Sequence, residues 1–224
     1  MLRRLLNLFR SPPLKVVRYV PSALELPAIW ADAGDNRRVP KLALLESASS
    51  AALLRLCDDF WDSYADDDDF EQPMIRDACV YRHALDILAT RGRDGLAWAH
   101  AHLRHPEYYA RQDAASLIWQ LAQSGQLGQD AEVIGDELVH LALRPPVEDT
   151  KEAQAASAAL TALSAIGGSA CMKAVRGVLT SPDWDQDDNQ WQAAEILAGI
   201  TTEAFMEAND PVAAAKTWLK ANPE

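Results

Sequence analysis

Cysteine is scarce in this chain, and its three copies lie far apart. Cys57, Cys79 and Cys171 form no Cys-x-x-Cys pair, and each has apolar sequence neighbours. An odd, dispersed set argues against a disulfide framework and against a cysteine-ligated zinc site. We therefore expect buried thiols in a reducing compartment, which makes the protein cytoplasmic.

Long apolar runs and strand-forming runs are also missing. No segment approaches the roughly 18 apolar residues of a membrane span. The opening MLRRLLNLF is too short for a secretory signal, and Asn7 interrupts it. Runs rich in Val, Ile and Thr are nearly absent, whereas alanine is abundant and 49% of the residues are hydrophobic. This composition predicts an all-α fold in which small side chains allow close helix packing.

Basic residues are outnumbered, with 21 Lys and Arg against 33 Asp and Glu and a net charge of −12. Such a surface repels a polyanion, so we expect no nucleic acid partner. The charge is uneven, because residues 1–24 hold five bases and no acid. Residues 25–224 therefore hold 16 bases against 33 acids, a net charge of −17. This acidic part favours another protein as partner, in particular a basic one.

The first forty residues differ from the rest in their proline content. Five prolines between Pro12 and Pro40 exclude a long helix. We expect an irregular basic arm over residues 1–40, with a short extended piece at 15–20, and a helical domain over residues 41–224. Residues 1–10 also have apolar side chains at helical spacing, which leaves open a peripheral membrane adaptor docked by this segment.

A Leu-x-x-Pro turn recurs along the helical domain, at residues 103–106, 143–146 and 179–182. The prolines are 40 and 36 residues apart. An acid follows each proline within two residues: Glu107, Glu148 and Asp183. Proline stops one helix, and the acid favours the positive N-terminal end of the next. The repeated turn therefore predicts a series of helix pairs.

Apolar residues at i, i+3 and i+4 spacing predict the helices themselves. The expected stretches are 44–60, 76–89, 96–103, 110–123, 134–141, 152–165, 172–179, 189–200 and a last helix from Pro211. Glycines 92, 125 and 167 are expected as C-caps, and Asp130, Ser169 and Asp210 as N-caps.

The helices after the turns share a residue pattern. It reads Arg111, Ala114, Ala115, Ile118, Leu121 and Gly125, and again Gln190, Ala193, Ala194, Leu197 and Ile200. The pattern and its period resemble HEAT repeats, in particular the short bacterial, PBS-lyase-like kind. The resemblance covers residues 73–224 and implies an α-solenoid, an α-α superhelix of antiparallel helix pairs. It also implies that the helices after the turns line a concave face where protein partners dock, and that Trp191 and Trp218 close the end of the core.

Candidate partner-binding side chains follow from this implied face. Exposed aromatics and arginine form hot spots of protein interfaces. The residues expected to contribute are Tyr108, Tyr109, Arg111, Gln112, Trp119 and Trp184. Trp191 is also a candidate for this face, with core packing as its alternative. A second candidate surface is the acidic loop of Asp66, Asp67, Asp68 and Asp69, a run of like charges typical of a solvated segment.

Motifs of catalysis are not evident in the sequence. It has no Ser/His/Asp or Cys/His arrangement and no glycine-rich phosphate loop. His100, His102 and His105 form a cluster that a metal could use, although spacing indicates no further ligand. Residues 183–187 place aspartates at calcium-loop spacing, but Asp188 replaces the required glycine and Ala194 the final glutamate. We expect no cofactor and no metal.

These observations predict a non-catalytic, HEAT-like protein-binding scaffold whose partner docks on the concave face and the acidic loops. One alternative is an immunity-type protein that neutralises a basic toxin, since an acidic surface complements a basic one. Another is a HEAT-based enzyme or metalloprotein that uses the histidines of residues 100–105.

Overall fold

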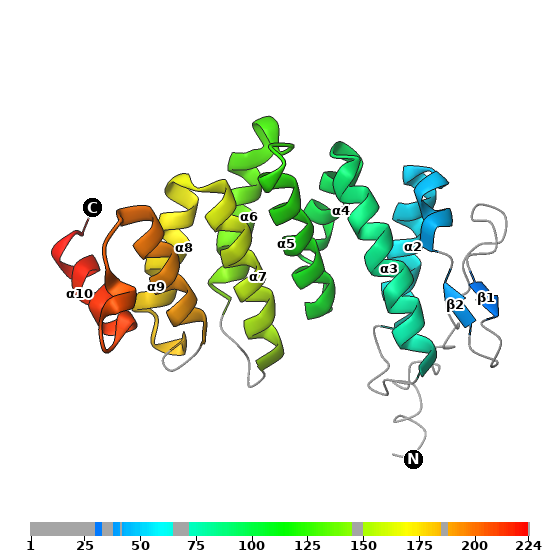
Figure 1. Ribbon diagram of the computed structural model, residues 1–224. Helices are drawn as coiled ribbons and strands as arrows, with labels where there is room; N and C mark the ends of the chain where they lie inside the picture. Colours follow the sequence, from blue (N-terminus) through cyan, green and yellow to red (C-terminus); the bar gives the residue numbers. More distant parts are fainter. Residues whose placement is uncertain are drawn as a thin grey trace, which may run out of the picture. The chain divides into compact units, whose positions relative to one another are not determined.

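The chain is almost wholly helical in the part that the computed structural model describes (Figure 1). That part comprises residues 30–32, 38–40, 42–64, 72–144, 150–184 and 188–223. The all-α class is confirmed there, with two strands of three residues each as the exception. None of the described helices is long and apolar enough to cross a membrane.

The chain forms two compact units, Met1–Ala84 and Leu85–Glu224. The described elements of the first are β1 (Trp30–Asp32), β2 (Arg38–Pro40), the 3-10 helix η1 (Leu42–Ser47), α2 (Ser50–Tyr64) and most of α3 (Gln72–Thr90). The boundary expected after residue 40 lies inside this unit.

The two strands pair antiparallel, with Trp30 opposite Pro40 and Ala31 opposite Val39. The prolines predict an irregular arm over residues 1–40. At residues 30–32 and 38–40 the backbone is instead a regular pair of strands. Pro40 is tolerated because it stands at the end of β2, where its missing N–H removes little of the ladder. The extended piece expected at residues 15–20 lies outside the described residues, as does the basic segment 1–24.

The helix expected over residues 44–60 is divided in two. After η1, α2 begins at Ser50, because the Ser49 hydroxyl accepts the backbone N–H of Ala52 at 3.2 Å as an N-cap. Phe60 of α2 stacks on Tyr81 of α3 with ring centroids 4.4 Å apart. The buried stripe is the expected one: Leu45, Ala48, Ala52, Leu53, Leu56, Cys57 and Phe60.

The second unit continues from the end of α3 through seven further α-helices. They are α4 (Arg93–His102), α5 (Tyr108–Gln123), α6 (Ala131–Ala142), α7 (Thr150–Ile166), α8 (Gly168–Thr180), α9 (Asp188–Thr201) and α10 (Pro211–Ala221). Each packs against the next one or two helices along the chain, side by side in Figure 1. Because α5 contacts α7 and α7 contacts α9, these three form one layer; α6, α8 and α10 form the other.

Pairs of buried alanines recur in the α5–α7–α9 layer. The pairs Ala114–Ala115, Ala155–Ala156 and Ala193–Ala194 are all buried in α5, α7 and α9. Larger apolar side chains fill the space beside them, among them Ile118, Leu163 and Leu197. A core of small side chains allows backbones to come near each other, and a substitution that adds volume is then costly.

Glycines end three of the helices where the sequence predicts C-caps. Gly92, Gly125 and Gly167 have φ angles of 65°, 69° and 73°, the left-handed region that other residues adopt at a cost. The N–H of Gly167 donates to the carbonyl of Leu163 at 2.8 Å, which satisfies the last turn of α7.

The expected N-caps have mixed outcomes. Asp210 is confirmed, since its carboxylate accepts the N–H of Ala213 at 2.9 Å with Pro211 at the first helical position. Asp130 stands at the N-cap of α6 but makes no side-chain capping bond. The N-cap predicted at Ser169 is wrong, because α8 already begins at Gly168 and Gly167 takes the N-cap position.

Gly95 and Gly199 provide a matched test of the close packing. A methyl group at Gly95 of α4 would lie 2.6 Å from the Leu88 carbonyl oxygen, whereas nothing lies within 4 Å of one at Gly199 of α9. We expect Gly95→Ala to lower the free energy of unfolding by about 1–3 kcal/mol through overpacking. Gly199→Ala should raise it by about 0.5–1 kcal/mol, since alanine is the better helix former. Urea unfolding of both variants checks this, and equal shifts in the same direction would contradict it.

Buried cysteines are confirmed for Cys57 and Cys171. Burial raises the pKa of the Cys171 thiol to about 11. This thiol therefore stays protonated at neutral pH and acts as a small apolar side chain.

Candidate partner-binding surface

Arg111 is the largest departure from the expected surface. Its side chain is wholly buried at the start of α5. Nη1 donates to the carbonyl oxygens of His105 and Pro106 at 2.5 and 2.6 Å, and Nη2 donates to the Glu152 carboxylate of α7 at 2.5 Å. The turn before α5 leaves these carbonyls unpaired, and the guanidinium satisfies them. The expected outward position of Arg111 is therefore wrong: the side chain ties the turn to the next helix of the layer.

Gln190 occupies the corresponding place in α9. It is 3% exposed, and its Nε2 donates to the carbonyls of Val178 and Ser181 at 3.3 and 3.5 Å. Ser181 precedes Pro182 as His105 precedes Pro106. Both buried polar side chains thus bind the backbone ahead of their own helix, three residues before an alanine pair. Glu152, the partner of Arg111, stands three residues before the alanine pair of α7.

The two tryptophans near the start of α9 differ in burial. Trp184, in the 3-10 turn η3 (Pro182–Trp184), is 1% exposed, so its expected position on the outer face is wrong. Trp191, for which an outer and a core position were both open, is 48% exposed and therefore lies on the outside. Trp191 directly follows the buried Gln190, and the helical step carries its side chain away from the core.

The remaining candidates on α5 keep some exposure. Tyr108, Tyr109 and Gln112 are half-buried, and Trp119 is 38% exposed, as expected for an outer face. The rings of Tyr108 and Tyr109 lie 4.0 Å apart, tilted by 40°. The acidic loop Asp66, Asp67, Asp68 and Asp69 lies outside the described residues.

A cleft of about 450 Å³ lies between α7 and α9 in the same layer. Gln192 forms one wall, and its Nε2 donates to the Ser157 carbonyl at 3.1 Å and to the Thr161 hydroxyl at 2.8 Å. The Ser157 hydroxyl donates back to Gln192 Oε1 at 2.8 Å. Because these bonds join α7 to α9, they hold the walls of the cleft in a fixed position. Glu195 and Ile200 complete the α9 side.

Two exposed apolar side chains of α9 belong to this region. Ile200 lines the cleft and is 46% exposed, whereas Trp191, 48% exposed, adjoins Gln192 in the sequence and is not itself a lining residue. In the described part of the chain, the other exposed large apolar side chains are Trp119 of α5 and Val133 of α6. We call the α7–α9 cleft with Trp191 the cleft surface. It combines a rigid polar wall, an acid and the exposed side chains of Ile200 and Trp191. Aromatic side chains are enriched in protein interfaces, and polar groups surround their cores.

The cleft residues are not among those that the sequence singles out. Ser157, Thr161 and Ser164 do carry a signal, since their i, i+4 and i+7 spacing marks one face of α7. Gln192 of α9 hydrogen-bonds to this face of α7, but the contact arises only from the packing of the two helices, which the sequence pattern does not show.

Two histidines of the cluster, His102 and His105, lie in a stack of rings with Trp98. Trp98 and His102 lie 4.1 Å apart and nearly parallel, and His105 follows 5.5 Å from His102. His102 Nδ1 is 2.9 Å from the Trp98 carbonyl, and His105 Nδ1 accepts the backbone N–H of Glu107 at 3.1 Å. Stacked rings do not direct their nitrogens to one point. Within the described residues no group of three or more His, Cys, Asp or Glu side chains could hold a metal.

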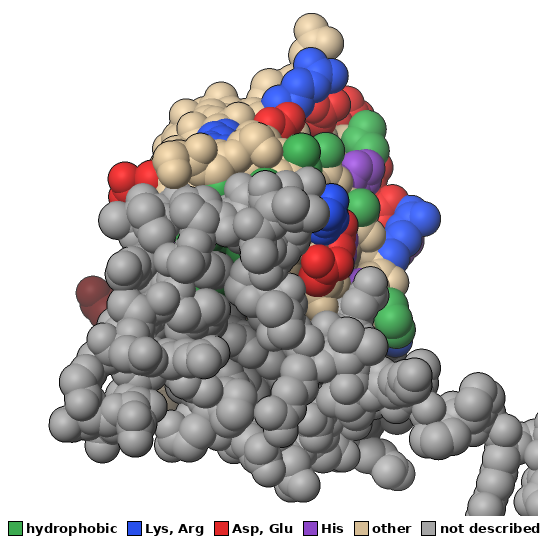
Figure 2. All heavy atoms as spheres, turned by 90° about the vertical axis from the view of Figure 1, so that its right-hand side faces the viewer, with side chains coloured by type: hydrophobic (Ala, Val, Ile, Leu, Met, Phe, Trp, Pro, Cys, Tyr) green, Lys and Arg blue, Asp and Glu red, His purple; other side chains and the backbone are tan. Residues whose placement is uncertain are grey.

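Arg104, in the turn between α4 and α5, forms an ion pair with Glu137 of α6. Arg104 donates from Nε to the Glu137 carboxylate at 2.8 Å, and this bond lowers the pKa of Glu137. On the face shown in Figure 2, the described Lys and Arg side chains likewise lie beside Asp and Glu. The described part of that face therefore has no field of a single sign.

Comparisons with protein-family models, with curated proteins and with solved structures find no match for this chain. The interpretation of the cleft surface thus depends on its own geometry.

Proposed function

We propose that this chain is a non-catalytic protein-binding scaffold, an α-solenoid of HEAT-like repeats whose partner docks on the α5–α7–α9 layer. The observation that carries the proposal is the cleft surface. It is a preformed groove with an exposed isoleucine beside a hydrogen-bonded polar wall, and the exposed Trp191 adjoins that wall in the sequence. Tryptophan is frequent among the hot spots of protein interfaces, and a rigid wall reduces the entropy lost on binding.

The repeat assignment is supported by the matching turns before α5 and α9. Arg111 and Gln190 differ chemically, yet each donates to backbone carbonyls at the proline turn ahead of it. Each also stands three residues before a buried alanine pair. Packing of each helix only against near neighbours in sequence is typical of solenoids.

A binding role is favoured over catalysis by the state of the polar groups in the cleft. The Gln192 amide, the Ser157 hydroxyl and the Thr161 hydroxyl already bond each other or backbone carbonyls. A general base or nucleophile needs such a group directed at a substrate instead. A partner side chain can rest on this wall without any of these bonds breaking.

A basic partner fits the charge of the surface. Glu195 lines the cleft, and residues 25–224 have a net charge of −17. Opposite charge accelerates encounter and disfavours acidic competitors. A basic toxin neutralised by an immunity-type protein is one partner of this description.

The test is affinity capture from the source cells with three forms of the protein. Trp191→Ala removes the exposed anchor of the cleft surface, and Val133→Ala removes an equally exposed apolar side chain from α6, in the other layer. We expect one basic protein to be captured by the wild type and by Val133→Ala, in a salt-sensitive manner, and to be lost with Trp191→Ala. Capture that all three forms share equally, or an acidic partner insensitive to salt, would overturn the proposal.

A further inference from the structure

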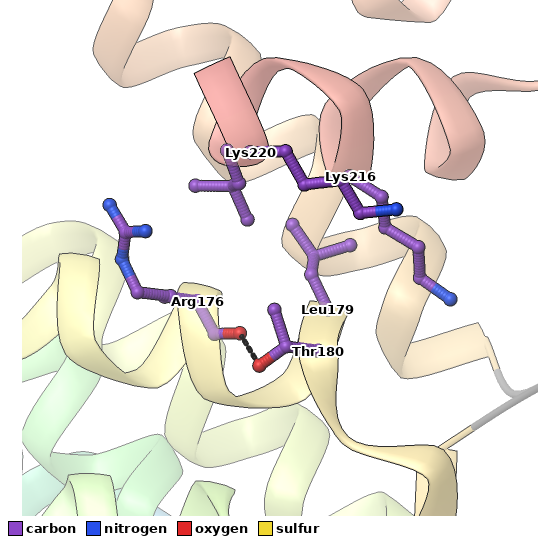
Figure 3. A pocket seen from close by; sticks show the side chains of 6 residues that line it. Arg176, Leu179, Thr180, Lys216 and Lys220 are labelled. Atoms are coloured by element: carbon purple, nitrogen blue, oxygen red, sulfur yellow. Dashed lines mark hydrogen bonds between the residues drawn. The ribbon is translucent and has the colours of Figure 1, made fainter. Parts of the chain in front are cut away.

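A second pocket, of about 470 Å³, lies between α8 and α10 and has the opposite charge from the chain as a whole. Arg176, Leu179 and Thr180 of α8 and Lys216, Leu219 and Lys220 of α10 line it. Figure 3 shows Arg176 on one side and the two lysines on the other, with Leu179 between them. Three cations thus surround an apolar floor.

The basic character extends over both helices. Among the α-helices that the structure describes, α8 and α10 are the only two without Asp or Glu. They carry four of the 21 basic residues, so the rest of the chain has 17 bases against 33 acids. A local positive field in an acidic protein attracts a short anionic group, whereas the surroundings repel a long polyanion.

The guanidinium of Arg176 is held in place by the fold. Arg176 Nη2 donates to the Asn222 carbonyl at 3.2 Å, which fixes the guanidinium near the end of α10. A guanidinium has five N–H donors, so this bond leaves others for a carboxylate. The Thr180 hydroxyl is engaged with the Arg176 carbonyl at 2.8 Å, and Leu179 and Leu219 are nearly wholly buried.

We propose that this pocket binds an acidic segment of a partner protein. One carboxylate pairs with Arg176 and a neighbouring carboxylate pairs with Lys220. A short acidic peptide supplies several carboxylates at this spacing, whereas the acids of the rest of the chain repel a long nucleic acid backbone. The site lies on a different pair of helices from the cleft surface, so the two proposals are independent.

The test uses a fluorescein-labelled octapeptide in which Asp and Glu alternate with Leu, titrated with the full chain in fluorescence anisotropy. We expect saturable binding that Arg176→Ala and Lys220→Ala each weaken at least tenfold. Two variants serve as controls that should bind like the wild type: Lys173→Ala, on α8 but outside the pocket, and Trp191→Ala, in the cleft surface.

Four results would overturn the inference. The first is a peptide with Asn and Gln in place of its acids that binds equally well. The second is unchanged affinity in Arg176→Ala and Lys220→Ala. The third is displacement of the peptide by inorganic phosphate or a short duplex oligonucleotide at matched charge. The fourth is self-association of the wild type that Arg176→Ala abolishes in sedimentation, which would assign the pocket to a second copy of the chain.

Discussion

Replacing Arg111 with alanine is expected to lower the free energy of unfolding by about 3–5 kcal/mol, the usual cost of breaking a buried ion pair from one side. The variant leaves the carbonyls of His105 and Pro106 without their donor and the Glu152 carboxylate without its cation. Because the Glu152 side chain is 21% exposed, water can solvate its carboxylate in part. The result should therefore lie near the lower end of the range. Urea unfolding followed by far-UV circular dichroism measures it.

The Arg104–Glu137 pair provides the control for Arg111. Arg104 is 76% exposed, so Arg104→Ala should leave the unfolding midpoint within experimental error. Arg111→Gln places the side chain of Gln190 in the corresponding position of α5, and it should recover part of the loss by donating to the turn carbonyls. An unchanged midpoint in Arg111→Ala, or equal losses in the alanine and glutamine variants, would contradict the assigned contacts.

The misplacement of Arg111 shows where the sequence signal ends. An arginine outside an apolar stripe is mostly exposed, which makes the outer face the default expectation. Its burial depends on Glu152, 41 residues away, and on carbonyls that only the folded turn leaves unpaired. The alanine pair after it was informative, because alanines at that spacing are the core positions of α5. Local pattern therefore predicts which helix faces the core, and not which polar group the core accepts.

The ends of the helices could be predicted because they depend on nearby residues, whereas the cleft surface depends on residues far apart in the sequence. The glycine C-caps and the Asp210–Pro211 start depend on bonds within a few residues, and they were predicted. The cleft surface depends on Gln192 reaching α7 across more than thirty residues, and it was not. Net charge is a sum over the chain, so the value of −12 conceals the acid-free helices α8 and α10.

Replacing Trp184 with alanine is the second change with a large expected effect, a loss of about 3–5 kcal/mol in the free energy of unfolding. The side chain is 1% exposed in the turn between α8 and α9, so its removal leaves a cavity of indole size. Trp191→Ala is the matched control, because the same atoms are removed from a side chain that is 48% exposed. Its loss should stay below about 1 kcal/mol.

Together, Trp184→Ala and Trp191→Ala distinguish a tryptophan that stabilises the fold from one that contacts the partner. Trp184→Ala should unfold at lower urea concentration and, where it is still folded, retain the captured partner. Trp191→Ala should unfold like the wild type and lose the partner. If Trp191→Ala is the less stable of the two, the aromatic anchor of the cleft surface is a core residue after all, and the proposed docking face loses its main contact. If Trp184→Ala alone abolishes capture while fully folded, the partner instead binds at the turn before α9.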